Sequence, residues 1–345
     1  MKNLSGQKRQ LSIVNILLLY GVYIIYIILF AVITSFSPGF VTPVNLIHLL
    51  TQASVTIIVC AGNAFVLLTA GIDMSLGSVA FFGPALAAFL LTNVAIQPWE
   101  AICVIVLTGI LLGTLNGLIV KQFNIYPLIT TLGVLFAGRG LGQYLIQGGV
   151  KVFPNEIQFF GNSSVLGVPV PIMIALVFLV GGQFILAKTS FGRQVVAIGD
   201  NEEAASKSGI NVGKVKLLVY IISGFAACVA GLVLTARVSV VDAATGKDLE
   251  FDALIALVLG GVSLFGAKGT VFPGAFIGAV FLTTIFNGLV ASNASPYLFP
   301  VIKGVAIFLA IFVDTTKTRR NVHSIFRVRD ISSQYATSEE VGMNK

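Results

Sequence analysis

The sequence predicts an all-α, polytopic membrane protein with about ten transmembrane helices. Its composition is 56% hydrophobic and only 10% charged, whereas about 25% of the residues in soluble domains are charged. Apolar runs of about 20 residues, the length that crosses a bilayer as a helix, recur along the chain. Glycines and aspartates interrupt two of these runs, which predicts broken helices inside the membrane domain.

The apolar runs define the expected spans. The first run, residues 11–34, is too long for a signal-peptide core and lacks a convincing cleavage site, so we expect a retained span. The other spans are expected at 44–69, 76–91, 101–120, 127–146, 169–187, 217–236, 251–270 (interrupted), 271–290 and 298–313. This predicts an N-terminal tail (1–10), a transmembrane domain (11–314) and a basic C-terminal tail (315–345).

The net charge of +7 could suggest a nucleic-acid partner. However, the basic residues are spread over loops and tails and do not form one patch with interleaved aromatic residues, so no nucleic acid is expected. Basic loops are typical of the cytoplasmic side, and they can also contact anionic membrane lipid. Both termini and residues 188–216 are therefore expected to be cytoplasmic, and 147–168 and 238–250 external.

The stretch Lys188–Lys216 is the longest polar interruption between two membrane-length runs. Its centre predicts a short helix, because Asp200 stands three residues before Glu203, a capping-box spacing. Gly209 follows at a position suited to the end of that helix. Such a helix between two spans could act as a lever for a soluble partner; the alternative is a solvated loop with one helical turn.

A second interruption is the segment TAGIDMSLGS at residues 69–78. Asp73 is costly at membrane depth unless it faces protein or water. The segment could be a discontinuous helix that lines a pathway. Equally, it could be an interfacial turn in which Asp73 caps the following helix.

Several of these motifs resemble one family. Glu203-Ala204-Ala205 followed by Gly209 resembles the EAA-x-x-x-G loop of permease subunits in bacterial ABC importers. The flanking FGRQVVAIGDNEEAASKSGINV, the Asp73 segment and FDALIALVLGGVSLFGAKGT are similar to the ribose/galactose/xylose-type sugar permeases. The resemblance covers about residues 46–314 and implies the bacterial cytoplasmic membrane, with six residues that contact an ATPase: Asp200, Glu202, Glu203, Ala204, Ala205 and Gly209.

The resemblance also implies partners. A separate ATPase subunit would carry ATP and Mg, because the chain's nearest match to a P-loop, Gly182–Thr189, lacks the second glycine. A periplasmic or lipid-anchored sugar-binding protein would deliver the solute. A second permease chain, identical or related, would complete the assembly, and this chain would bind no cofactor or metal and be no enzyme.

A weak internal repeat supports a transporter fold. Leu115–Ile129 is similar to Phe286–Phe299, with Asn-Gly-Leu before a short loop and a proline. The copies lie an odd number of expected spans apart, which predicts two inverted halves of about five spans each, a 5+5 repeat. We expect matching broken elements, Ala70–Ser78 and Asp252–Gly266, to form the pathway walls, with Asp73 and Asp252 orienting the breaks.

The polar residues in the apolar runs are mostly neutral, which suits a neutral polyhydroxylated solute; hydrogen bonds between helices are the simpler explanation for each. The pathway candidates are Asn63, Thr69, Asp73, Ser75, Asn116, Asp252, Ser263 and Asn287. Nucleosides or branched-chain amino acids are alternative solutes. An ion-coupled secondary transporter would need more deep carboxylates or histidines than this chain has, and a membrane enzyme would need a metal-ligand or nucleophile–base group that the sequence lacks.

Overall fold

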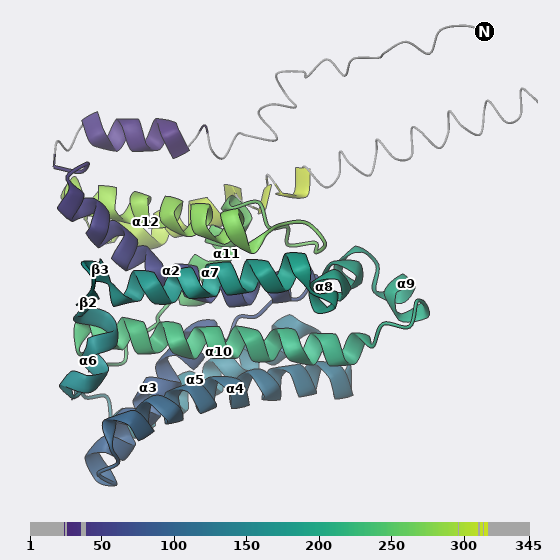
Figure 1. Ribbon diagram of the computed structural model, residues 1–345, viewed down its shortest axis with the longest axis horizontal. Helices are drawn as coiled ribbons and strands as arrows, with labels where there is room; N and C mark the ends of the chain where they lie inside the picture. The colour runs from purple at the N-terminus through teal and green to yellow at the C-terminus, as the bar shows by residue number, and fades with distance from the viewer. Residues whose placement is uncertain are drawn as a thin grey trace, which may run out of the picture.

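A computed structural model describes residues 24, 26–35, 39–295, 297–309, 311–312 and 314–316. The predicted N-terminal tail, the start of the first expected span and all but the beginning of the C-terminal tail lie outside the described residues. The described part is a bundle of long helices that run roughly side by side (Figure 1). Two short helices, α8 and α9, project at one end of the bundle, and α6 lies at the other.

Ten helices and one π-helical turn carry most of the described chain. Their bounds are α2 (Pro43–Leu68), α3 (Leu76–Asn93), α4 (Pro98–Phe123), α5 (Pro127–Ile146), α7 (Val170–Lys188), α10 (Val212–Val238), α11 (Leu249–Leu259), η1 (Val271–Ala275), α12 (Phe276–Ala291), and two further apolar helices at Tyr26–Ser35 and Leu298–Thr316. Seven of the described helical stretches are long and apolar enough to cross a membrane: α2, α3, α4, α7, α10, Val271–Ala291 and Leu298–Thr316.

Two of the spans expected within the described residues are not among these seven helices. α5 has the predicted bounds, Pro127–Ile146, but it is not among the seven apolar helices because glycines, threonines and Arg139 dilute its sequence. The interrupted run at 251–270 forms α11, a helix of 11 residues, followed by irregular backbone. The described residues therefore bear out a mostly helical, polytopic protein.

Helix α10 lies at the centre of the bundle, packed against α4, α2 and α3. Its close contact with α4 depends on α4 glycines spaced four apart, which line one face of that helix. A Cβ at Gly109 or Gly113 would overlap the backbone carbonyl of Gly224 or Tyr220, and a Cβ at Gly117 would lie 2.9 Å from the Cα of Leu217. Only glycine lets the two backbones approach this closely.

The connection after α5 is not the plain loop that its composition suggests. It contains β1 (Lys151–Val152), α6 (Asn155–Asn162), β2 (Ser164–Val165) and β3 (Val168–Pro169). β2 pairs with β3, and β1 pairs antiparallel with β4 (Val240–Val241), in the register Lys151↔Val241 and Val152↔Val240. The connection is thereby tied to the segment that follows α10.

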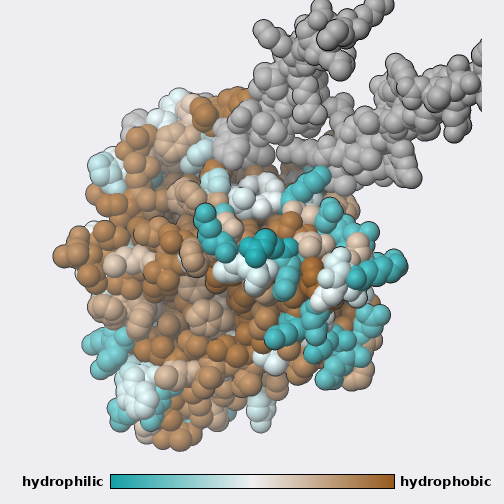
Figure 2. Space-filling view, turned by 45° about the vertical axis from the view of Figure 1, so that its right-hand side comes forward, coloured by the Kyte–Doolittle hydropathy of each residue, from teal (hydrophilic) through white to brown (hydrophobic). Residues whose placement is uncertain are grey.

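The surface has the distribution expected of a membrane protein. Hydrophilic side chains gather at the end where α8 and α9 project, and the band beside them is largely hydrophobic (Figure 2). On α7, for example, Leu176, Val177, Val180 and Phe184 are exposed. Such a band would be unfavourable in water, and lipid contact explains it.

Non-helical backbone interrupts the bundle in three places. Residues 69–75 join α2 to α3, residues 239–248 join α10 to α11, and residues 260–270 join α11 to η1. Each contains left-handed backbone; Ala70, Gly246 and Gly266 have φ of 56°, 63° and 84°. The first and third fall where the sequence predicts breaks, whereas the second lies in a segment that the sequence predicts as an external loop.

Candidate coupling and translocation site

The stretch between α7 and α10 folds into two helices, α8 (Ser190–Asp200) and α9 (Glu202–Lys207). The side-chain oxygen of Asn201 accepts a hydrogen bond from the N–H of Ala204 at 2.9 Å and caps α9. The prediction that Asp200 caps this helix is wrong, because Asp200 is the last residue of α8. Aspartate and asparagine cap helices about equally well, so the point where the chain turns decides between them.

The end of α9 matches the prediction for Gly209. This residue has φ of 86°, its N–H donates to the carbonyl of Ser206 at 3.0 Å, and the N–H of Ile210 donates to Ala205 at 3.1 Å. These two bonds form a Schellman motif, which favours glycine at its left-handed position. The turn aims the chain from α9 back toward α10.

The two glutamates of α9 form different ion pairs. Glu203 pairs with Lys207 one turn later at 2.7 Å, and both side chains are more than three-quarters exposed. Glu202 pairs with Lys216, near the start of α10, also at 2.7 Å. Among the predicted coupling residues, Ala205 is buried and the rest are exposed at this end of the bundle: Asp200, Glu202, Glu203, Ala204 and Gly209.

The first break is organised around the carboxylate of Asp73. One oxygen accepts hydrogen bonds from the N–H and the hydroxyl of Ser75, at 2.9 and 2.6 Å. The other accepts from the hydroxyl of Ser223 on α10 at 2.7 Å. The amide of Asn116 on α4 donates to the Ser75 hydroxyl at 2.9 Å. These four side chains are no more than 2% exposed, so the break is held inside protein and is not an exposed interfacial turn.

Two further contacts fix the extended backbone of this break. The hydroxyl of Thr131 on α5 accepts a hydrogen bond from the N–H of Met74 at 3.1 Å. The hydroxyl of Tyr220 on α10 lies 3.5 Å from the carbonyl of Ile72. Backbone that leaves a helix at membrane depth needs such partners, and here α4, α5 and α10 supply them.

α8 contacts two breaks at one point. The N–H of Ala267, in the 260–270 segment, donates to the carbonyl of Leu68 at the end of α2, at 3.0 Å. Gly199 packs against both groups: a Cβ there would overlap the Leu68 carbonyl and lie 2.5 Å from the Ala267 nitrogen. The coupling segment is therefore in direct backbone contact with the two breaks that the sequence predicts.

The 260–270 segment is anchored by Asp314. Its carboxylate accepts hydrogen bonds from the Leu264 N–H at 2.9 Å and from the hydroxyl of the pathway candidate Ser263 at 3.2 Å. Asp252 does not take part. It lies in the first turn of α11 and forms an ion pair with Lys303 at 2.8 Å, so the prediction that Asp252 orients this break is wrong.

A pocket of about 230 Å³ joins the first break to the coupling segment. The candidate Thr69 lines it together with the α4–α5 connection and Tyr220, and the ion pair of Glu202 with Lys216 lies at its wall. Among the described residues, this is where a predicted pathway residue and a predicted coupling residue meet.

The remaining candidates lie apart from this site. Asn287 on α12 accepts a long hydrogen bond, 3.4 Å, from Asn45 in the first turn of α2. Asn63 is buried within α2, and its side-chain oxygen has no hydrogen-bond partner among the described residues. The structure thus brings together Asp73, Ser75 and Asn116, with Thr69 close to the coupling segment.

Sequence reasoning missed two important contacts, those of Ser223 and Gly199. A serine in an apolar helix gives no sign of the residue it will face across the bundle. Gly199 lies inside the FGRQVVAIGD motif, but the motif alone does not show that its Cα touches other backbone.

A bundle of apolar helices with buried breaks and a polar element joined to them suits a membrane transport permease. A family model described as "Branched-chain amino acid transport system / permease component" matches residues 45–311. The chain is 36% identical to a ribose import permease of Haemophilus influenzae over 85% of this chain and 91% of the relative. It is 33% identical to a ribose import permease of Bacillus subtilis over 92% and 99%. It is 35% identical to a D-allose transport system permease of Escherichia coli over 86% and 91%.

No solved structure matches the chain. The family match and the relatives show that the chain belongs to this family of transport-system permease components. It is a transport subunit and a multi-pass protein of the bacterial cytoplasmic membrane, which confirms the expectation from the coupling motif. Permeases of this family work with an ATPase subunit and a substrate-binding protein.

Proposed function

We propose that this chain is the permease subunit of an ATP-driven importer and forms the translocation pathway for a small neutral sugar delivered by an external binding protein. The relatives support the solute class, since they are named as permeases for ribose, fructose and D-allose. Those relatives are 33–36% identical over more than four-fifths of this chain.

The observation that carries the mechanism is the contact of Gly199 with the carbonyl of Leu68 and the N–H of Ala267. A partner ATPase that grips the exposed surface of α9 would displace α8, because a single residue, Asn201, joins the two helices. Close-packed backbone transmits such a displacement because it cannot be compressed. The ends of both breaks then move together, and the pathway switches from being open on one side of the membrane to being open on the other.

The network around Asp73 supports a neutral solute. Its carboxylate already accepts three hydrogen bonds from Ser75 and Ser223, so its role is to position the break and not to bind a cation. Asn116 and Thr131 add neutral hydrogen-bonding groups next to the same break, through their bonds to Ser75 and Met74. A sugar needs donors and acceptors in its path but no counter-charge.

The assembly would contain further components. This chain binds no cofactor, and ATP with Mg belongs to the ATPase subunit. The binding protein is periplasmic or lipid-anchored. Two permease chains, identical or related, stand over the two nucleotide-binding subunits that close on each other during hydrolysis.

The full membrane domain would have about ten spans in a 5+5 inverted repeat. Support comes from the contact between Gly77 and Gly246, in which each packs against the carbonyl of the other. Each glycine follows an aspartate four residues earlier, Asp73 or Asp242, whose carboxylate caps its own turn. The mate of the Asp73 break is then the segment 239–248, between α10 and α11, in place of residues 252–266.

A branched-chain amino acid is the second candidate solute, because the description of the family model names that class. Such a solute carries an ammonium and a carboxylate, and the network around Asp73 contains no cation to face the carboxylate. Binding and uptake assays with both solute classes separate the two candidates.

The test is uptake by proteoliposomes that contain the permease, its ATPase and its binding protein. Labelled ribose, D-allose, fructose and leucine are offered in parallel, with ATP inside the vesicles. The proposal predicts ATP-dependent accumulation of one of the sugars. Accumulation of leucine alone would replace the sugar with the second candidate.

A further inference from the structure

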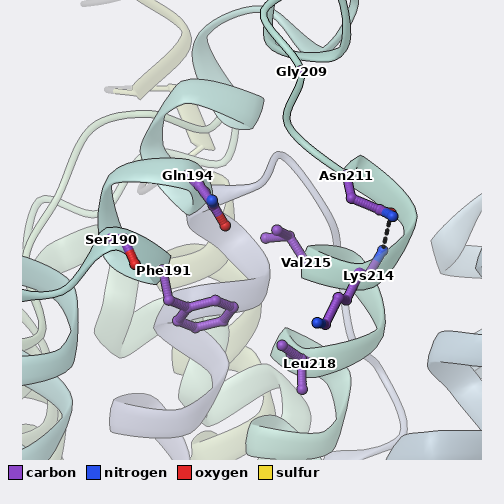
Figure 3. A pocket seen from close by; sticks show the side chains of 8 residues that line it. All are labelled: Ser190, Phe191, Gln194, Gly209, Asn211, Lys214, Val215 and Leu218. Carbon is purple, nitrogen blue, oxygen red and sulfur yellow. Dashed lines mark hydrogen bonds between the residues drawn. The ribbon is translucent and has the colours of Figure 1, made fainter.

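A second pocket, of about 370 Å³, lies between α8 and the start of α10. Figure 3 shows the amide of Gln194 and the amino group of Lys214 directed toward its centre, with the ring of Phe191 beside them. The other lining residues are Ser190, Gly209, Asn211, Val215 and Leu218. One side of the pocket is therefore polar and cationic, and the other is apolar.

Among the residues that the structure describes, the cation in this pocket forms no ion pair. Lys207 and Lys216, its neighbours in the coupling segment, both form ion pairs at 2.7 Å. In the part of the chain that the structure describes, no carboxylate lies within ion-pair distance of Lys214, and its side chain is exposed. The pocket thus offers a positive charge next to hydroxyl and amide groups, which suits an anion.

The pocket lies at the end of a membrane span. α7 ends at Lys188, and Ser190, two residues later, lines the pocket. From the pocket, Leu218, Ile222 and Phe225 follow one face of α10 at four- and three-residue intervals. Phe225 is only partly buried and stacks on Phe178 of α7, with ring centroids 5.5 Å apart. An apolar strip therefore leads from the pocket along α10 between the membrane spans.

We propose that this pocket binds the headgroup of an anionic phospholipid from the cytoplasmic leaflet. The lipid phosphate would face the ammonium of Lys214 and the amide of Gln194. One acyl chain would lie along Leu218, Ile222 and Phe225. Basic pockets between helices at the cytoplasmic surface suit such headgroups, and each nearby Lys contributes about 1 kcal/mol to their attraction.

Such a lipid would touch α8 and α10 together, at Gln194 and Lys214, and would hold the coupling segment against the bundle. This inference does not depend on which solute the permease carries. A soluble phosphate offers the same charge without acyl chains, and the partner ATPase could cover the same pocket. Both are outcomes of the test.

The experiment measures lipid retained by the full-length chain. Vesicles of phosphatidylethanolamine with a minor fraction of phosphatidylglycerol receive the wild-type chain, Lys214→Gln or Lys207→Gln. After extraction in mild detergent, mass spectrometry counts the phosphatidylglycerol bound per chain. We expect Lys214→Gln to retain about fivefold less, and the control Lys207→Gln, with the same change in charge, to retain the wild-type amount.

A second variant, Leu218→Asn, keeps the charge and should lower retention through the acyl chain. Gel filtration confirms that each variant is folded before lipid is counted. Equal retention by the wild type and Lys214→Gln, or an equal loss in Lys207→Gln, would overturn the proposal. Release of the lipid by inorganic phosphate would assign the pocket to a free anion, and release by the partner ATPase would assign it to that protein; either result refutes a lipid site.

Discussion

Replacing Gly199 with alanine would test whether α8 drives the breaks. The new Cβ would overlap the carbonyl of Leu68 and lie 2.5 Å from the nitrogen of Ala267, and both contacts are with backbone that cannot rotate away. Overpacking of this kind costs about 1–3 kcal/mol. Opening the hydrogen bond between Ala267 and Leu68 would add about 0.5–1.5 kcal/mol.

This strain falls at the junction of α8 with the two breaks, because the overlapped atoms belong to Leu68 and Ala267. We expect Gly199→Ala to assemble with its ATPase but to transport several-fold fewer sugar molecules per ATP hydrolysed. The assay compares uptake and ATP hydrolysis in the same proteoliposomes, normalised to the amount of intact assembly found by gel filtration.

The matched control is Gly181→Ala in α7, since Gly181 is also helical and a Cβ there would meet no atom within 4 Å. It should transport as the wild type does. If Gly199→Ala assembled normally and kept the wild-type ratio of sugar to ATP, the junction would not transmit the motion.

Three further predictions concern the other parts of the site. Glu203→Lys should insert normally and lose both transport and solute-stimulated ATP hydrolysis, because it places a cation on the exposed acidic surface of α9; wild-type transport would remove α9 from the mechanism. Asp73→Asn should keep partial transport, since an amide can still bond to Ser75 and Ser223, and Asp73→Ala should lose more; equal activities would contradict the network. In a cysteine-free chain, Ser206→Cys should react with an impermeant thiol reagent only from the cytoplasmic side, and labelling from outside would overturn the topology.

Local signals in the sequence were sufficient for the helices and their ends. The apolar runs placed α2, α5 and α7 to within a residue at each end, because the length of a span is set by the bilayer. Gly209 was predicted from its position alone, since few residues accept a left-handed backbone. The cap of α9 was missed by one residue, because Asp200 and Asn201 are both good caps.

Contacts across the bundle could not be predicted in the same way. The glycine pair after Asp252 predicts that this residue orients a break, but Asp252 forms an ion pair with Lys303, which lies on a helix about 50 residues later. Likewise, Ser223 reaches Asp73 only because α10 and the first break are neighbours in space. A single sequence does not show which side chains will pair across the bundle. For this reason only some of the predicted pathway residues lie together in the structure.

On this mechanism, the permease moves a sugar only when a partner ATPase drives it through α8 and α9. The most direct measurement is uptake of the cognate sugar by proteoliposomes with and without that ATPase, under ATP and under an imposed ion gradient. We expect accumulation only with the ATPase, the binding protein and ATP present together. Accumulation driven by an ion gradient in vesicles that lack any ATPase would contradict it.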